Sequence, residues 1–330
     1  MRFAKLALAA VVSVFSAQVM HVDTASAEDV LSATTALPKN LTNSVNFLKW
    51  VEQVNAKGKG VVRITYRGGP EAIPTFEQGE AVRNGVVDMV YTPSNYYAGQ
   101  VPETDAFVAA TVSPADARKN GGFELLNQVH QKKMNAYLLA NFEALQEFHI
   151  YLRNEPKFKA DGMPDFSGVK IRGTPIYREF FINLGATFVN MPPPEVYTAL
   201  ERGAVDGAGW PRIGLMDANW DKFLKYRLDP GFYSVDLAVL VNLDKWKKLT
   251  PASRDLLQKM AMDYEVQSIQ DNVVKAKQED AELMKRGVKF VSMQPAAAKR
   301  FLDEAYKLAW DRMKSRDPAN VDALRKAYSK

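Results

Sequence analysis

The stretches AVRNGVVDMVYTP at residues 81–93 and ALERGAVDGAGWP at residues 199–211 decide the fold of this chain. In each, a predicted helix end meets a glycine, and a short apolar strand that carries an aspartate then leads to a proline. The glycine suits the end of a helix, where a residue with positive φ is common. In open α/β sheets, ligands bind beside the carboxyl ends of the strands. The two units therefore predict two domains whose loops face each other across a cleft. The alternative is that each is an ordinary turn from helix to strand.

Around these units, predicted strands alternate with predicted helices, which indicates α/β architecture. Several strands are continuous apolar runs, as expected for sheets that helices cover on both faces. A helical spacing of apolar residues at 42–55 precedes the first of these strands. The strands are predicted at residues 61–66, 86–90, 148–150, 169–172, 187–189 and 237–241.

A long helix is predicted from Pro251 to about Arg286, because this stretch contains no further proline and no glycine. Thr250 suits the helix cap, and Pro251 suits the first helical turn. At a rise of 1.5 Å per residue, a helix of about 35 residues is roughly 50 Å long. It is therefore expected to span two domains, although two helices with an unmarked break are the alternative. Further helix is predicted over residues 295–329.

The first 27 residues have the layout of a secretory signal peptide. Arg2 and Lys5 form a basic start, an apolar run follows, and Ala25-Ser26-Ala27 is a small-residue cleavage site. The apolar run of about ten residues is too short to span a bilayer. Secretion to the periplasm is therefore expected, with an uncleaved anchor as the alternative.

The composition and motifs do not indicate an enzyme. The chain has no cysteine, and beyond the predicted signal peptide it has only His130 and His149. It lacks a phosphate-binding loop and a nucleophile elbow. Its formal net charge of +5 is spread along the sequence, without a basic block suited to nucleic acid. No catalytic residue, metal, cofactor or nucleic-acid partner is therefore expected.

Five residues are candidates for a ligand site. Arg172 ends a predicted strand and precedes a glycine, so its planar guanidinium could bind a carboxylate with two hydrogen bonds. Arg153 also ends a predicted strand, and a structural salt bridge is the alternative for both arginines. Trp210 could form an aromatic wall of the cleft or pack at a domain boundary. Asn95 and Tyr96 follow the first repeat unit and could hydrogen-bond a ligand or lie on the loop surface.

The order and spacing of several motifs resemble the periplasmic solute-binding subunits of TRAP transporters, the DctP type. The resemblance covers essentially the whole chain after residue 27. Its strongest stretch includes FSGVKIR at residues 166–172, and it continues with residues 185–186, 191–192 and 195–207. Residues 101–107, 241–242 and 246–250 also match.

This resemblance implies a two-domain α/β periplasmic binding protein with a ligand cleft between the domains and a long domain-spanning helix. The domains are expected at residues 28–150 plus about 238–270, and at 151–237 plus about 271–330. The protein would close on a small organic carboxylate and deliver it to the small and large subunits of a membrane permease.

By the same resemblance, Arg172 grips the ligand carboxylate, Arg153 assists it and Trp210 lines the pocket. The loops near Pro70 and at Asn95–Tyr96 match pocket-facing regions less specifically. Some 2-oxoacid-binding members carry Glu-Trp after the second motif and hold a metal, whereas this chain has Gly209-Trp210. Metal-assisted binding is therefore not expected. The other functions to be weighed are a periplasmic hydrolase or lyase acting on an organic acid and a solute sensor that docks on a receptor.

Overall fold

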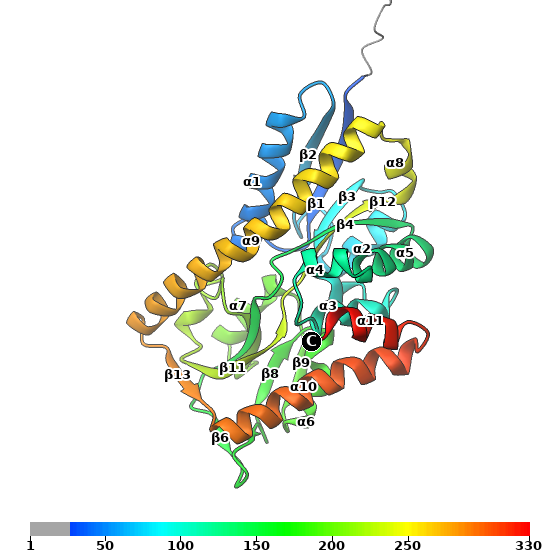
Figure 1. The fold of residues 1–330 in the computed structure, drawn as a ribbon. Coiled ribbons are helices and arrows are strands. Elements are labelled where there is room, and N and C mark those ends of the chain that lie inside the picture. The colour runs from blue at the N-terminus through cyan, green and yellow to red at the C-terminus, as the bar shows by residue number, and fades with distance from the viewer. Residues whose placement is uncertain (1–26) are drawn as a thin grey trace, which may run out of the picture.

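The computed structural model describes residues 27–330, which form two β-sheets surrounded by helices (Figure 1). The predicted signal peptide lies outside these residues, except for its last position. The first sheet has the strand order β2-β1-β3-β12-β4 and the second has the order β13-β11-β5-β10-β8-β9. Strands of the first sheet are β1 (Asp29–Thr35), β2 (Val62–Gly68), β3 (Met89–Thr92), β4 (Ala136–Phe142) and β12 (Leu237–Asn242). Strands of the second are β5 (Glu147–Leu152), β8 (Lys170–Gly173), β9 (Thr187–Asn190), β10 (Gly207–Pro211), β11 (Tyr226–Ser234) and β13 (Lys289–Ser292). A small hairpin pairs β6 (Lys157–Phe158) with β7 (Pro164–Asp165).

The helices connect and cover the strands. The α-helices are α1 (Thr42–Lys57), α2 (Gln78–Arg83), α3 (Asp105–Val108), α4 (Pro114–Lys119), α5 (Gly122–Met134), α6 (Arg178–Asn183), α7 (Pro193–Glu201), α8 (Leu243–Lys248), α9 (Pro251–Lys285), α10 (Pro295–Arg316) and α11 (Val321–Tyr328). Short 3-10 turns occur at η1 (Thr75–Glu77), η2 (Ser94–Tyr96), η3 (Pro102–Thr104), η4 (Pro175–Tyr177) and η5 (Trp220–Lys222). Over residues 27–330, none of the helices combines the length and apolarity that crossing a membrane requires.

The two repeat units form the same local structure, one in each sheet. Gly85 and Gly203 adopt φ values of 71° and 66° after the preceding helices. In the first unit, β3 runs parallel to β1, and Asp88 Oδ2 accepts a 2.7 Å hydrogen bond from the backbone N–H of Ser32. In the second, β10 runs parallel to β8, and Asp206 Oδ2 accepts a 2.9 Å bond from the N–H of Lys170. In both units the aspartate therefore ties a turn from helix to strand to the neighbouring strand of its sheet.

One predicted strand differs from the observed one. The strand expected at residues 86–90 begins only at Met89, and Val86 is 73% exposed. At Asp88 the side chain and the backbone N–H both bind Ser32 of β1, in place of a backbone-to-backbone ladder. The apolar run Val86-Val87 is therefore a turn that leads into the sheet.

Helix α9 is one continuous helix, so the alternative of two helices is wrong. Thr250 caps it by accepting a 3.2 Å hydrogen bond from the N–H of Ser253. Near its start, Trp50 of α1 donates through its indole nitrogen to the carbonyl of Met260, at 3.1 Å. The first part of α9 is thereby bound to the helix that packs on the first sheet (Figure 1).

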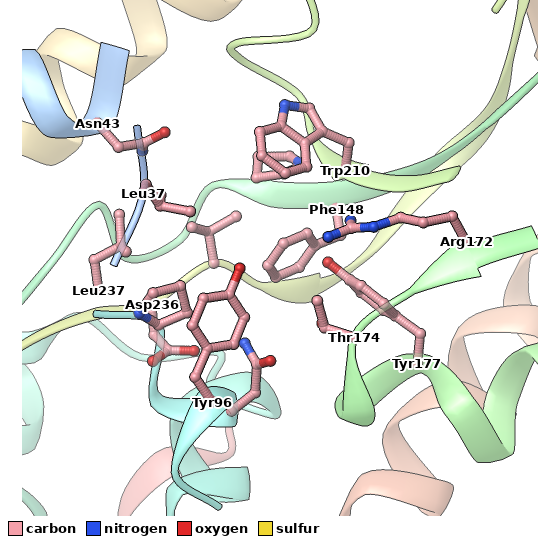
Figure 2. A pocket seen from close by; sticks show the side chains of 14 residues that line it. Leu37, Asn43, Tyr96, Phe148, Arg172, Thr174, Tyr177, Trp210, Asp236 and Leu237 are labelled. Atoms are coloured by element: carbon pink, nitrogen blue, oxygen red, sulfur yellow. The ribbon is translucent and has the colours of Figure 1, made fainter. Parts of the chain in front are cut away.

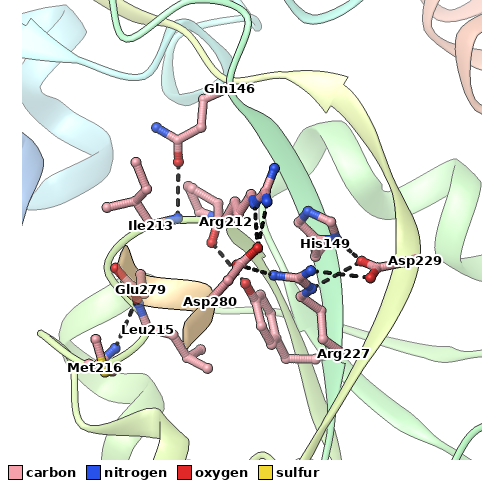
Figure 3. A network of polar contacts seen from close by, with 12 residues as sticks. Gln146, His149, Arg212, Ile213, Leu215, Met216, Arg227, Asp229, Glu279 and Asp280 are labelled. Carbon is pink, nitrogen blue, oxygen red and sulfur yellow. Dashed lines mark hydrogen bonds and ion pairs between the residues drawn. The ribbon is translucent and has the colours of Figure 1, made fainter. Parts of the chain in front are cut away.

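The last part of α9 is bound to the second sheet by charged groups (Figure 3). Asp280 accepts a 2.5 Å hydrogen bond from Arg227 on β11 and bonds of 2.5 and 3.1 Å from Arg212, directly after β10. Next to it, Glu279 accepts backbone N–H bonds from Gly214 and Leu215, at 2.8 and 2.9 Å. The long helix thus contacts both sheets, as its length predicts.

Two crossover segments also connect the sheets, residues 143–146 between β4 and β5 and residues 235–236 between β11 and β12. A backbone hydrogen bond of 2.6 Å joins the two segments. Three residues at or beside them, Glu143, Leu145 and Tyr233, have positive φ values of 64°, 63° and 52°. The residue bounds of the two domains stay a prediction.

Candidate functional site

A cavity lies between the two sheets, and both repeat units contribute to its wall (Figure 2). From the first sheet and its loops come Leu37, Asn43, Pro93, Asn95, Tyr96 and Leu237. From the second come Phe148, Arg172, Thr174, Tyr177, Trp210 and Pro211, and the second crossover adds Val235 and Asp236. The cavity has a volume of about 30 Å³. That is room for a few water molecules rather than for an organic acid.

The carboxyl ends of β3 and β10 meet at this cavity. Pro93 and Asn95, just after β3, line it on one side, and Trp210 and Pro211, the last residues of β10, line it on the other. Because both strands run parallel to their neighbour, each unit presents its loop at the carboxyl end of a parallel pair.

Arg172 lies fully buried at the end of β8. Its Nε donates to the carbonyl of Met191 at 2.9 Å, and its Nη1 donates to the carbonyl of Gly209 at 3.1 Å. Its Nη2 has no hydrogen-bond partner among the described residues. No described carboxylate lies within ion-pair distance of the guanidinium, so a structural salt bridge does not explain this arginine. Two carbonyls hold the fork in place and leave one nitrogen free to bind.

Two tryptophan rings flank the Arg172 guanidinium. Its central carbon lies 5.7 Å from the centre of the Trp210 ring and 5.6 Å from that of Trp220. The two rings contact each other edge to face, with centres 4.5 Å apart. Aromatic faces attract a cation and exclude water, so this setting stabilises the charge without neutralising it. Burial nevertheless lowers the pKa of Arg172, and the hydroxyl of Tyr96 opposes that shift.

Tyr96 and Tyr177 bring hydroxyl groups to the same region, and Figure 2 shows them converging on Arg172 and Phe148 from different elements. Burial raises the pKa of Tyr96 to about 12, although the positive charge of Arg172 acts in the opposite direction. Burial also raises the pKa of Tyr177 well above its usual value. Both phenols are therefore neutral at physiological pH and able to donate a hydrogen bond.

Several residues that line the cavity each have a buried polar atom without a hydrogen-bond partner among residues 27–330. These atoms are Asn95 Oδ1, Arg172 Nη2, Thr174 Oγ1, Trp210 Nε1 and Asp236 Oδ1. In folded proteins the large majority of buried polar side-chain atoms are paired. A cluster of unpaired donors and acceptors in one cavity therefore indicates a place where a polar ligand binds.

The structure brings together Arg172, Trp210, Asn95 and Tyr96 but not the other two predicted site residues. Strand register places Arg153 at the far end of β5, because Leu152 pairs with Gly207 while Phe148 pairs with Pro211 beside the cavity. There its guanidinium donates to the carbonyl of Leu200. We therefore leave Arg153 out of the binding site described below.

Pro70 is likewise absent from the lining. It lies in the turn after β2, beside Gly69, where a Cβ atom would lie 3.3 Å from the carbonyl oxygen of Leu37. Leu37 lines the cavity and Pro70 does not.

Sequence reasoning missed most of the lining, including Phe148, Thr174, Tyr177 and Asp236. Two of them carried a usable signal. Thr174 lies two positions after Arg172, and Asp236 directly precedes the apolar strand predicted at 237–241. A charged residue at the start of a buried strand has to be explained by a partner or a site.

Both histidines within residues 27–330 are buried, and each has a protein oxygen beside its Nδ1 atom. His130 is buried, its Nδ1 lies 2.6 Å from the carbonyl of Leu126, and burial lowers its pKa to about 4. His149 lies in β5, as predicted, with its Nδ1 3.0 Å from Asp229. Over residues 27–330, no three His, Cys, Asp or Glu side chains are grouped so as to hold a metal.

Comparison with known proteins shows the family of this chain. The family model described as "Bacterial extracellular solute-binding protein, family 7", DctP, matches residues 33–317. The chain is 27% identical over 229 residues to a monocarboxylate 2-oxoacid-binding periplasmic protein of Nostoc sp.. That match covers 66% of this chain and 60% of the relative, less than two thirds of its length.

Two solved structures show the fold. An extracytoplasmic solute receptor of Bordetella pertussis binding pyroglutamic acid has a TM-score of 0.79 and 18% identity, over 91% of this chain and 99% of its own. A TRAP periplasmic solute-binding protein from Rhodoferax ferrireducens with bound malonate has a TM-score of 0.77 and 22% identity, over 90% and 96%. The arrangement of two α/β domains joined by crossovers and a long helix is thus shared with solute receptors.

Proposed function

Because this chain belongs to the bacterial extracellular solute-binding protein family 7, the DctP family, we propose that it is the solute receptor of a TRAP transporter and that it binds a small organic carboxylate through Arg172. The family consists of receptors rather than enzymes, so the hydrolase and lyase alternatives are not kept. The observation that carries the proposal is the buried guanidinium, which the two carbonyls orient and which leaves Nη2 unpaired beside the cavity.

The physical basis is the pairing of buried charges. A charge that is taken out of water destabilises the protein unless an opposite charge or good hydrogen bonds replace the water. Arg172 is fully buried and receives no carboxylate from the described residues. A ligand carboxylate would supply that missing charge and would itself recover the hydration energy it loses. Charge-assisted hydrogen bonds to a guanidinium are about twice as strong as neutral ones.

The ligands of similar proteins support this class of solute. The similar structures bind pyroglutamic acid and malonate, and the Nostoc relative is described as binding 2-oxoacids. These compounds are small and differ in shape, but each carries a carboxylate.

Binding would include closure of the cavity. At about 30 Å³ the cavity is too small to hold an organic acid unless its walls move apart. Those walls come from two sheets that are joined by the crossovers 143–146 and 235–236 and by α9. Hinges commonly consist of a few residues at the ends of secondary-structure elements. Rotation about the crossovers would admit the solute and then enclose it.

The remaining parts of the proposal concern place and partner. Secretion by the segment at residues 1–27 would bring the receptor to the periplasm, in keeping with an extracellular family. There it would pass its solute to the membrane subunits of the transporter.

Variants of Arg172 test the proposal. Arg172→Met keeps the length of the side chain and removes its charge, and Arg172→Lys keeps the charge but not the planar fork. Removal of one partner from a buried charged pair costs about 2–5 kcal/mol, which is roughly 30-fold to several-thousandfold in affinity. Calorimetry with pyroglutamate, malonate and pyruvate should show that loss in Arg172→Met and poor binding in Arg172→Lys.

The matched control is Arg202→Ala, at an exposed arginine directly after α7. It should bind like the wild type, and circular dichroism should confirm that every variant is folded. Equal affinity of Arg172→Met and the wild type, or a wild type that binds no organic acid, would refute the proposal.

A further inference from the structure

The described residues pair only one of the two carboxylate oxygens of Asp236. It is 1% exposed, and it lies in the crossover between β11 and β12, where it lines the cavity. Its Oδ2 accepts a 2.9 Å hydrogen bond from the backbone N–H of Ser94. Its Oδ1 is buried and has no partner among residues 27–330. Holding the turn at Ser94 therefore accounts for one oxygen and leaves the other unused.

Unpaired donors and acceptors occupy different parts of the cavity wall. On the second sheet the unpaired lining atoms are Arg172 Nη2, a donor on β8, and Thr174 Oγ1, a hydroxyl that can donate or accept. The acceptors Asn95 Oδ1 and Asp236 Oδ1 come from the loop after β3 and from the crossover that enters β12, both next to the first sheet. The charged donor and the charged acceptor of the cavity thus come from opposite sheets.

A simple carboxylate satisfies only the donors. Its two oxygens accept hydrogen bonds, so it could pair with Arg172 and the hydroxyl of Thr174 and would leave Asp236 Oδ1 unpaired. A buried acceptor without a donor costs about 1–3 kcal/mol, and more if it is charged. A second carboxylate near Asp236 would add repulsion between like charges. A solute that carries an N–H or O–H group would remove both penalties.

We propose that Asp236 accepts a hydrogen bond from the solute, so that the preferred ligands are small acids carrying an N–H or O–H donor in addition to the carboxylate. The inference rests on the function proposed above, because the solute is oriented by the pairing of its carboxylate with Arg172. Asp236 then acts as a specificity-determining residue at the other end of the same cavity. Hydroxy acids and lactam acids have the required chemistry.

The hydroxyl of Ser94 and three phenols lie near the Asp236 side chain, and none of them forms a hydrogen bond with its Oδ1 within the described chain. The phenols of Tyr96, Tyr97 and Tyr177 are close enough for the Asp236 charge to raise their pKa values. None of these hydroxyls donates a hydrogen bond to Asp236 within the described chain. The oxygen therefore remains available to a bound solute.

Matched pairs of acids test the inference. Pyroglutamate carries a ring N–H that cyclopentanecarboxylate lacks, and lactate carries a hydroxyl that propionate lacks. A hydrogen bond to a charged group contributes about 1.5–3 kcal/mol, so calorimetry on the wild type should show at least about tenfold tighter binding of the donor acid in at least one pair.

Asp236→Asn is the informative variant. Its amide oxygen can still accept the bond from Ser94, whereas its amide nitrogen offers a donor where the solute needs an acceptor. The donor acids should weaken about tenfold or more, while the donor-free acids should change less than about threefold, so the preference is lost. Asp263→Asn, on the exposed face of α9, is the control and should preserve the preference.

The outcomes separate the two proposals. If the acids bind and depend on Arg172 but show no donor preference, or if Asp236→Asn retains the preference, the role of Asp236 is wrong and the receptor function stands. If the wild type binds none of the four acids, both proposals fail. Weakening of all four acids by the same factor would indicate a structural role only and would also overturn the inference.

Discussion

Arg312 on α10 and Asp105 on α3 form a buried ion pair through two hydrogen bonds, Nε to Oδ2 at 2.9 Å and Nη2 to Oδ1 at 2.8 Å. The same guanidinium donates to the carbonyl of Ile176 at 3.0 Å and to Glu179 at 3.3 Å. Asp105 belongs to the segment between β3 and β4 of the first sheet, and Ile176 and Glu179 belong to the segment between β8 and β9 of the second. One side chain near the end of the sequence therefore joins both halves of the molecule.

Loss of this pair should destabilise the folded protein strongly. In Arg312→Ala the Asp105 carboxylate stays buried without its partner, and breaking such a pair costs about 3–5 kcal/mol. Unfolding in urea, followed by circular dichroism, measures the change. Lys259→Ala removes an exposed pair of 2.9 Å with Asp263 and should cost less than about 1 kcal/mol. A similar small loss in both variants would contradict the assignment.

The stability of the solute-free protein should depend on the ionisation of Asp236. Burial raises the pKa of Asp236 from its usual 3.8 to about 7, partly opposed by its hydrogen bonds with Ser94. Between about pH 4 and 7 the folded state therefore binds more protons than the unfolded state, and the contribution of this group to stability falls as the pH rises.

Asp236→Asn cannot ionise, so its stability relative to the wild type should increase from pH 4 to 7 and then level off. Thermal unfolding of both proteins at half-unit pH steps measures this difference. A difference that is constant over the range, or that grows toward acid pH, would show that the carboxyl is not perturbed in this direction.

Gly207 should tolerate no side chain, because β10 is packed closely against β5. A Cβ atom there would lie 2.7 Å from the carbonyl oxygen of Tyr151 and 2.7 Å from Leu152 Cδ2. Gly207→Ala should therefore lower the free energy of unfolding by about 1–3 kcal/mol, the usual cost of overpacking. Gly99→Ala, where a Cβ atom would meet nothing within 4 Å, should be nearly neutral in the same urea experiment. Equal stability of the two variants would be the contrary result.

Solute should reduce the size of the wild-type receptor. If the two halves close on the ligand, small-angle scattering should give a smaller radius of gyration after addition of a bound acid, because the ligand favours the state that it contacts best. Arg172→Met under the same conditions should give the same profile with and without acid. A wild-type profile that does not respond to saturating ligand would exclude closure by a hinge.

Much of the fold could be predicted from short local signals. Gly203 with Asp206 marked the second repeat unit, and Thr250-Pro251 marked the start of the long helix, since capping residues and left-handed glycines depend on local backbone geometry. The strand limit at Met89 could not be predicted, because the side chain of Asp88 competes for the N–H of Ser32 from a strand far away in the sequence.

The sequence predicted those site residues whose type and local position were unusual enough to suggest a function. Arg172 at the end of a strand was such a case, and Trp210 was another, although it lies in strand β10 and not in a loop. Arg153 had the same local pattern as Arg172, yet the antiparallel register of β5 places it at the other end of the sheet. Asp236, directly before a predicted apolar strand, carried a signal that a buried charge needs a partner, but its place in the cavity wall depends on the crossover that returns the chain to the first sheet.

A binding site whose walls come from two sheets has a consequence for transport. A solute enclosed between the two halves would not exchange with competing anions while the receptor diffuses to the membrane, so its release would depend on separation of the two halves. Differences in affinity among related complexes arise mainly in the dissociation rate. Every contact that tightens binding would thus slow dissociation of the solute, and the required rate of delivery would set an upper limit on the affinity.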